Sequence, residues 1–87
     1  MSGERRFNDA CRKVIDEVLS ERAYQIQRWE ASDVAKEPVD WIAVLVLLLG
    51  KAAQELDLYQ GPNFNSKRFR KRLVQVAATC MNAAEKY

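Results

Sequence analysis

Trp41–Leu49 reads WIAVLVLLL, nine consecutive apolar residues in a chain of 87. This run decides the fold. A surface helix alternates apolar and polar faces, whereas a helix built from this run has apolar side chains in every direction around its axis. We therefore expect the run to be surrounded, either by the rest of the chain or by another copy of it. It is far shorter than the roughly 20 residues of a membrane-spanning helix.

Apolar residues spaced by three and four positions predict an amphipathic helix on each side of this run. We expect helices over about residues 8–31, 39–59 and 66–86, in a single all-α domain that spans residues 1–87. Asn8 is the expected N-cap of the first helix, Pro38 precedes the second, and Asn65 or Ser66 caps the third. Mid-helix Gly50 indicates the close approach of a neighbouring helix.

The apolar stripes of the two outer helices should face the core. In the first helix the stripe comprises Cys11, Val14, Ile15, Val18, Leu19, Ala23, Ile26 and Trp29. In the third helix it comprises Phe69, Leu73, Val76, Ala77, Cys80 and Ala84. Their place on these stripes predicts that both cysteines are buried, reduced thiols. The first residues of the chain are charged and lack the apolar segment of a secretory signal, so we expect a cytoplasmic protein.

The size of the chain favours self-association. A domain this short buries only about 60–65% of its unfolded surface, and small domains with an apolar helix commonly complete their core by oligomerising. We expect a homodimer or tetramer, with the interface on the second helix at Leu45, Leu47, Leu48 and Leu49. The chain has no histidine. This excludes serine–histidine and cysteine–histidine catalysis within one chain, and any zinc site built on histidine.

Three segments in order carry a family resemblance: residues 21–29 (ERAYQIQRW), residues 41–53 (WIAVLVLLLGKAA) and residues 70–78 (RKRLVQVAA). Together they resemble the MazG-like group of all-α nucleoside triphosphate pyrophosphohydrolases, especially its short phage and bacterial members. The resemblance implies a three-helix MazG-like bundle, completed by homo-oligomerisation. It also implies a vestigial nucleotide site at Gln25, Trp29, Trp41, Lys51 and Gln75. For the two tryptophans, packing in the core is the alternative interpretation.

The chain departs from this family where the family holds magnesium. The positions that match the family's metal-binding carboxylates are Leu47, Leu48, Lys51 and Arg72. Magnesium requires oxygen ligands, which leucine does not offer, and lysine and arginine would repel the ion. The resemblance therefore indicates a degenerate relative with no metal site and no cofactor. Magnesium enters only if hydrolysis is retained.

A basic cluster opens the third helix, with five cations in six residues: Lys67, Arg68, Arg70, Lys71 and Arg72. Residues 67–87 carry a net charge of +5 and residues 1–66 a net charge of −3. One interpretation is a solvated helix end, partly offset by acids of the first helix or of a neighbouring subunit. The other is a binding site for a phosphate, a nucleic-acid backbone or an acidic protein surface.

Three functional hypotheses follow. The first is a non-enzymatic MazG-like protein that binds a protein partner and, if it comes from a phage, inhibits a host factor in the host cytoplasm. The second is a residual nucleoside triphosphate pyrophosphohydrolase. The third is a nucleotide or nucleic-acid binder that acts through the basic cluster at residues 67–72.

Overall fold

The structure is a computed structural model that describes residues 2–57 and 64–87, with side chains described for residues 8–29, 35–56 and 64–87. It consists of three helices: α1 (Ser2–Val34), α2 (Pro38–Asp57) and α3 (Ser66–Ala84). No strand occurs in the described residues, which confirms the all-α class. None of the described helices is long and apolar enough to cross a membrane.

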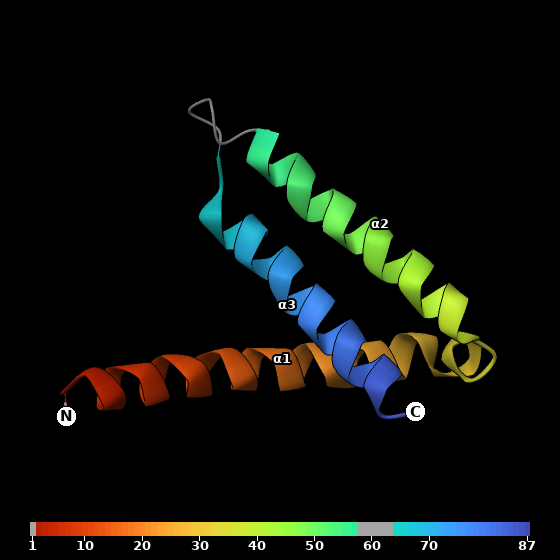
Figure 1. The fold of residues 1–87 in the computed structure, drawn as a ribbon, viewed down its shortest axis with the longest axis horizontal. Coiled ribbons are helices and arrows are strands. Elements are labelled where there is room, and N and C mark those ends of the chain that lie inside the picture. Colours follow the sequence, from red (N-terminus) through yellow and green to blue (C-terminus); the bar gives the residue numbers. More distant parts are fainter. Residues whose placement is uncertain (1, 58–63) are drawn as a thin grey trace.

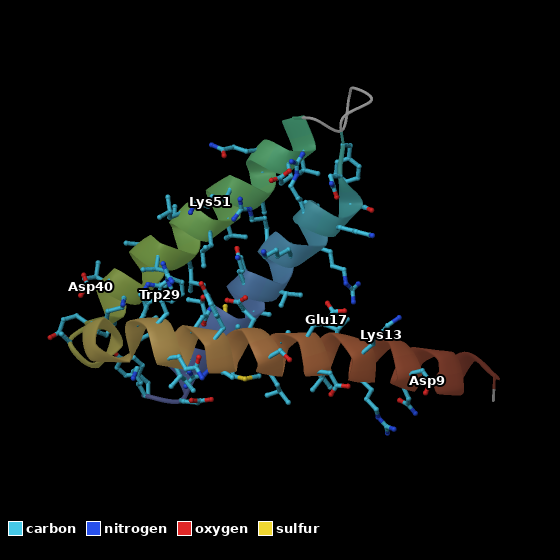
Figure 2. All side chains as sticks on the ribbon, turned by 180° about the vertical axis from the view of Figure 1, so that it is seen from behind. Asp9, Lys13, Glu17, Trp29, Asp40 and Lys51 are labelled. Carbon is cyan, nitrogen blue, oxygen red and sulfur yellow. The ribbon has the colours of Figure 1, made fainter. Side chains whose placement is uncertain are left out.

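The three helices are arranged around α3 (Figure 1). Helices α2 and α3 lie side by side and antiparallel, and α3 crosses the second half of α1. Over the described residues, α1 and α2 do not pack against each other, so α3 is the element that joins them. The first half of α1 extends past α3, and Asp9 and Lys13 lie on this extension (Figure 2).

The helix boundaries differ from the predicted ones at several ends. α1 begins at Ser2 and ends at Val34, so Asn8 is not its N-cap and the link before α2 is only residues 35–37. Residues 4–6 are glutamate and two arginines, which favour a helix even without apolar periodicity. α3 ends at Ala84, two residues early, and the predicted last residues of α2 (58 and 59) lie outside the described residues.

Local capping explains two of the helix starts. The side chain of Asn65 accepts a hydrogen bond from the Arg68 backbone N–H at 3.1 Å, which confirms one of the two predicted N-caps of α3. At the start of α2, Asp40 Oδ2 accepts a hydrogen bond from the Glu37 backbone N–H at 2.8 Å. Pro38 is the first residue of α2, where its missing N–H costs nothing.

The core is small and half polar. Among the described residues, four apolar side chains are buried (Val18, Trp41, Ala52 and Ala78), together with four polar ones (Gln25, Glu55, Thr79 and Asn82). None of the large side chains is completely buried. The core therefore relies on hydrogen bonds and one buried carboxylate as much as on apolar packing.

The predicted apolar stripe of α3 is not its buried face. Leu73, Ala77, Cys80 and Ala84 are exposed, whereas α3 buries Ala78, Thr79 and Asn82. At its contacts α3 places Ala78, one of its four alanines, together with the polar side chains of Thr79 and Asn82. A small side chain at the contact allows two helices to pack closely. The prediction of buried cysteines fails with it, because Cys80 is exposed and Cys11 is half-buried. In α1, likewise, Ile15, Leu19, Ala23 and Ile26 are exposed.

The single chain is open for its mass. Its accessible surface is 6813 Å², whereas a compact protein of this mass exposes about 5,200 Å². Its radius of gyration is 15.1 Å, against about 12 Å for a compact domain of this length. The apolar run is not surrounded by its own chain, since Ile42, Val46, Leu47 and Leu49 are exposed.

Gly50 is not in close contact with another helix among the described residues. A Cβ built on Gly50 would meet nothing within 4 Å in this part of the chain. The close approach of a neighbouring helix that we expected there is not found within the described chain.

Candidate ligand pocket

A cavity of about 390 Å³ opens where the three helices meet. Its walls come from the second half of α1, the link before α2, the first two thirds of α2, and α3. The lining residues are Glu21, Tyr24, Gln25, Trp29, Lys36, Trp41, Val44, Leu48, Lys51, Arg72, Gln75, Thr79 and Asn82. This volume lies within the range of small-molecule sites, which are concave and combine aromatic walls with a few polar groups.

All five residues of the vestigial nucleotide site line this one cavity: Gln25 and Trp29 from α1, Trp41 and Lys51 from α2, and Gln75 from α3. They are separated by up to 50 positions in the sequence. Leu48 and Arg72, which match carboxylate positions of the MazG-like family, line the same cavity. Figure 2 shows Trp29 near the end of α1 and Lys51 on α2.

The two tryptophans have different environments. Trp41 is 3% exposed, and its indole N–H is buried without a hydrogen-bond partner. Lys36 Nζ lies 5.2 Å and Lys86 Nζ 5.9 Å from the centre of the Trp41 ring, within the range of a cation–π contact. Trp29 is 44% exposed and meets the Tyr24 ring edge-on, with 6.0 Å between ring centres.

A polar row on α3 forms one wall of the cavity. Gln25 Nε2 donates to Thr79 Oγ1 at 3.2 Å, and Thr79 Oγ1 donates to the Gln75 carbonyl at 2.8 Å. This chain of hydrogen bonds ties α1 to α3 at their crossing. The carbonyl that accepts from Thr79 is the backbone carbonyl of Gln75, whereas the Gln75 side chain accepts a hydrogen bond from an Arg72 guanidinium nitrogen at 3.4 Å.

The charge of the cavity favours anions. Lys36, Lys51 and Arg72 line it, against the single carboxylate of Glu21. Lys51 makes no ion pair with the described part of the chain. In the same residues no group of three or more His, Cys, Asp or Glu side chains is placed to hold a metal ion. The arrangement can bind an anionic, aromatic ligand, but it offers no cluster of oxygen ligands for a divalent ion.

Three of the five cations in the basic cluster are engaged in ion pairs. Arg68 Nε lies 3.3 Å and Arg72 Nε 3.8 Å from the carboxylate of Glu55, which is buried on α2. Arg70 donates two hydrogen bonds to Glu17 of α1, at 2.9 and 3.0 Å. These hydrogen bonds lower the pKa of the Glu17 carboxyl.

The two remaining cations of the cluster, Lys67 and Lys71, are exposed and form no ion pair with the described residues. Glu17 of α1 offsets part of the charge of the cluster, as one interpretation expected. That interpretation did not include Glu55 of α2, which pairs with Arg68 and Arg72. The free positive charge at this end of α3 is therefore smaller than the sequence indicates.

The four leucines predicted as an interface divide into two pairs. Leu45 and Leu48 are half-buried, and Leu48 lines the cavity. Leu47 and Leu49 are exposed. The exposed large side chains of the run are Ile42, Val46, Leu47 and Leu49. The prediction therefore included two half-buried leucines and omitted Ile42 and Val46.

Six lining residues were not predicted as site residues: Glu21, Tyr24, Lys36, Val44, Thr79 and Asn82. A signal was present for α3, because Arg72, Gln75, Thr79 and Asn82 follow each other at helical spacings of three, four and three. No such signal marks Lys36, which enters from the short link.

Comparisons with protein-family models, curated proteins and solved structures found no significant match to this chain. The MazG-like resemblance therefore stays a prediction.

Proposed function

We propose that this chain is a degenerate MazG-like protein that binds a nucleotide in the cavity between its three helices and does not hydrolyse it. The observation that carries the proposal is the convergence of Gln25, Trp29, Trp41, Lys51 and Gln75 on one cavity. Three helices bring them together although nothing in local spacing requires it.

The proposal assigns a role to each wall of the cavity. Trp29 is the stacking surface for a base, because its ring is partly exposed at the cavity while that of Trp41 is enclosed. Lys51 and Arg72 receive phosphate oxygens. Gln25 and Gln75 offer amide groups for the base or the sugar.

The absence of hydrolysis follows from the charges at the wall. Phosphoryl chemistry of this class uses a divalent ion to neutralise the triphosphate and to activate water. Here Lys51 and Arg72 line the cavity, and Glu55 is held between Arg68 and Arg72. Positive side chains can bind the phosphates but cannot hold the ion.

Titration calorimetry with nucleoside mono-, di- and triphosphates, without a divalent ion, tests the binding step. We expect saturable binding that weakens roughly tenfold in Lys51→Gln, the loss expected for one charge-assisted contact. Trp29→Ala should weaken binding of nucleotides but not of inorganic triphosphate. The matched control is Lys67→Gln, which removes an exposed lysine outside the cavity. Equal losses in the two lysine variants, or no binding of any nucleotide, would contradict the proposal.

A pyrophosphate-release assay with Mg²⁺ or Mn²⁺ tests the catalytic step. We expect no turnover with any nucleoside triphosphate. Turnover that disappears in Glu55→Gln, with nucleotide binding retained, would establish the hydrolase hypothesis instead.

The exposed outer face of α2 supports a second candidate function, action through a bound protein, which for a phage-encoded chain would be inhibition of a host factor. Ile42, Val46 and Leu47 are each about 60% exposed. Isolated apolar residues at a surface are ordinary, but contiguous ones mark a contact site. This candidate requires the face to be free in the purified protein, so a chain that stays monomeric at high concentration would favour it.

A further inference from the structure

The side chain of Gln25 has a fixed orientation at the wall of the cavity. Gln25 lies on α1, lines the cavity and is only 5% exposed. Its Nε2 lies 3.2 Å from Thr79 Oγ1, and the same hydroxyl lies 2.8 Å from the backbone carbonyl of Gln75. A threonine hydroxyl carries one hydrogen, so it can donate in only one of these two contacts.

The two distances show that Thr79 donates to the carbonyl and accepts from Gln25. Hydrogen bonds from a hydroxyl to an oxygen are about 2.5–3.0 Å long, whereas those from an amide N–H to an oxygen extend to about 3.2 Å. The contact of 2.8 Å fits a hydroxyl donor, and that of 3.2 Å fits only an amide donor. A helical threonine also bonds readily to the carbonyl four residues before it. Gln25 must therefore turn its NH₂ group towards Thr79.

This orientation leaves the amide oxygen of Gln25 for a ligand. Gln25 forms no other hydrogen bond with the part of the chain that the structure describes. Its oxygen can accept hydrogen bonds and cannot donate one. A ligand that meets this oxygen must therefore supply a hydrogen.

Gln25 is placed to contact the base of the proposed nucleotide. It lies four residues before Trp29 on α1, so the two side chains share one face of the helix, and both line the cavity. The proposed function makes Trp29 the stacking surface and places the phosphates at Lys51 and Arg72. The exocyclic groups of a base project from the edge of its ring. A side chain beside the stacking surface meets these groups first.

We propose that the cavity selects bases with an amino group over bases with a keto group at the same ring position. An amino group donates to the amide oxygen of Gln25. A keto oxygen there would face a second acceptor, and neither group could supply the hydrogen. Thr79 is a positioning residue, because it determines which end of the Gln25 amide meets the ligand. This inference rests on the proposed function, since it names the class of nucleotide that the same cavity takes.

Two pairs of nucleotides test the selection: ATP against ITP, and CTP against UTP. Within each pair the ligands differ only at the edge that carries the amino or keto group, and their phosphates are identical. Titration calorimetry without a divalent ion measures all four. With the wild-type chain we expect the amino member of each pair to bind about tenfold more tightly, the difference made by one hydrogen bond.

Variants of Thr79 test its positioning role. Thr79→Val keeps the shape of the side chain but removes the hydroxyl, so the Gln25 amide can turn over and the preference within each pair should disappear. Thr79→Ser keeps the hydroxyl and is the matched control, which should retain the preference. A merely structural role for Thr79 would weaken all four nucleotides alike and leave the ratio within each pair unchanged.

A second variant keeps the test valid where circular dichroism shows that Thr79→Val does not fold. Gln25→Leu removes the acceptor itself and leaves α3 unaltered, so it too should abolish the preference. Lys51→Gln is the opposite control, because it should weaken all four nucleotides and preserve both ratios.

The outcomes separate this inference from the proposed function. Equal affinities within both pairs in the wild-type chain, or tighter binding of ITP and UTP, would overturn the inference and leave nucleotide binding established. An unchanged preference in folded Thr79→Val would overturn the role of Thr79. Failure of all four nucleotides to bind would overturn the proposed function and the inference with it.

Discussion

At the scale of single residues, two carboxylates organise the charge of the molecule. Glu55 is buried and lies near the guanidinium groups of Arg68 and Arg72, whereas Glu17 meets Arg70 on a partly exposed surface. Both carboxylates bind cations of the same α3 cluster, from opposite neighbouring helices. They therefore attach the basic start of α3 to α1 and to α2.

Replacement of Glu55 by glutamine should destabilise the fold. The change leaves two guanidinium groups without their counter-charge, but Arg68 is half exposed and water recovers part of the loss. We expect the free energy of unfolding to fall by about 1–2 kcal/mol, measured by urea denaturation. Glu37→Gln, at an exposed position in the link, is the control and should change it by less than about 0.5 kcal/mol. Equal effects of the two changes would contradict the role of the buried carboxylate.

Acid should weaken the fold through Glu17 and Glu85. Glu17 accepts hydrogen bonds from Arg70, and Glu85, just after α3, accepts one from Arg22 of α1. These hydrogen bonds lower the pKa of both carboxyls below the ordinary value of 4.5. Their contribution is complete above that ordinary pKa and is lost as the pH falls through the lower folded-state pKa. Helical signal followed during acid titration should therefore show a transition below about pH 4.5 that is smaller in Glu17→Gln. The neighbouring change Asp16→Asn should leave the transition unaltered.

At the scale of elements, the second helix shows how far the sequence could be used. Pro38 and the apolar run located α2 closely, because proline geometry and hydrophobicity act locally. The direction in which the run faces could not be deduced, since every direction is apolar. For α3 the apolar periodicity misled, because α3 buries the polar residues Thr79 and Asn82, and Thr79 accepts a hydrogen bond from Gln25 of α1.

The residues of the candidate site likewise divide into those that the sequence indicated and those that it did not. Gln25, Trp29, Trp41, Lys51 and Gln75 were found from a family resemblance, not from their spacing, since local periodicity cannot relate positions on three helices. Lys36, Thr79 and Asn82 were missed because they lie outside the three segments of the resemblance. Glu21, Tyr24 and Val44 lie inside these segments, but the resemblance gives them no role.

Gly50 offers a test at this scale. Among the described residues nothing lies within 4 Å of an added Cβ, so Gly50→Ala should improve the helix. We expect a gain of about 0.5–1 kcal/mol in the free energy of unfolding, measured by urea denaturation. A loss of stability would mean that another group contacts Gly50.

At the scale of the whole molecule, charge and shape give different impressions. The basic last quarter of the sequence, residues 67–87, suggests a nucleic-acid binder, but its three arginines pair with Glu17 and Glu55. Lys67 and Lys71 are what remains for a phosphate backbone. The shape of the molecule is more informative than its charge, because its radius of gyration exceeds that of a compact domain of this length.

Binding to nucleic acid should accordingly be weak. With two free lysines, the slope of log K against log salt should not exceed about 2 for duplex DNA. Fluorescence anisotropy over a salt series measures it, and Lys67→Glu with Lys71→Glu should abolish it. A slope of 4 or more would mean that the three arginines leave their carboxylates, which would restore the nucleic-acid hypothesis.

The position of α3 between the other two helices has a consequence for biosynthesis. A ribosome makes α1 and α2 first, and neither packs on the other once it emerges. The apolar faces of both helices therefore stay exposed to solvent until α3 has left the exit tunnel. During that interval the nascent chain is a natural client for chaperones, and a stop codon placed before Ser66 would leave two helices with nothing to fold upon.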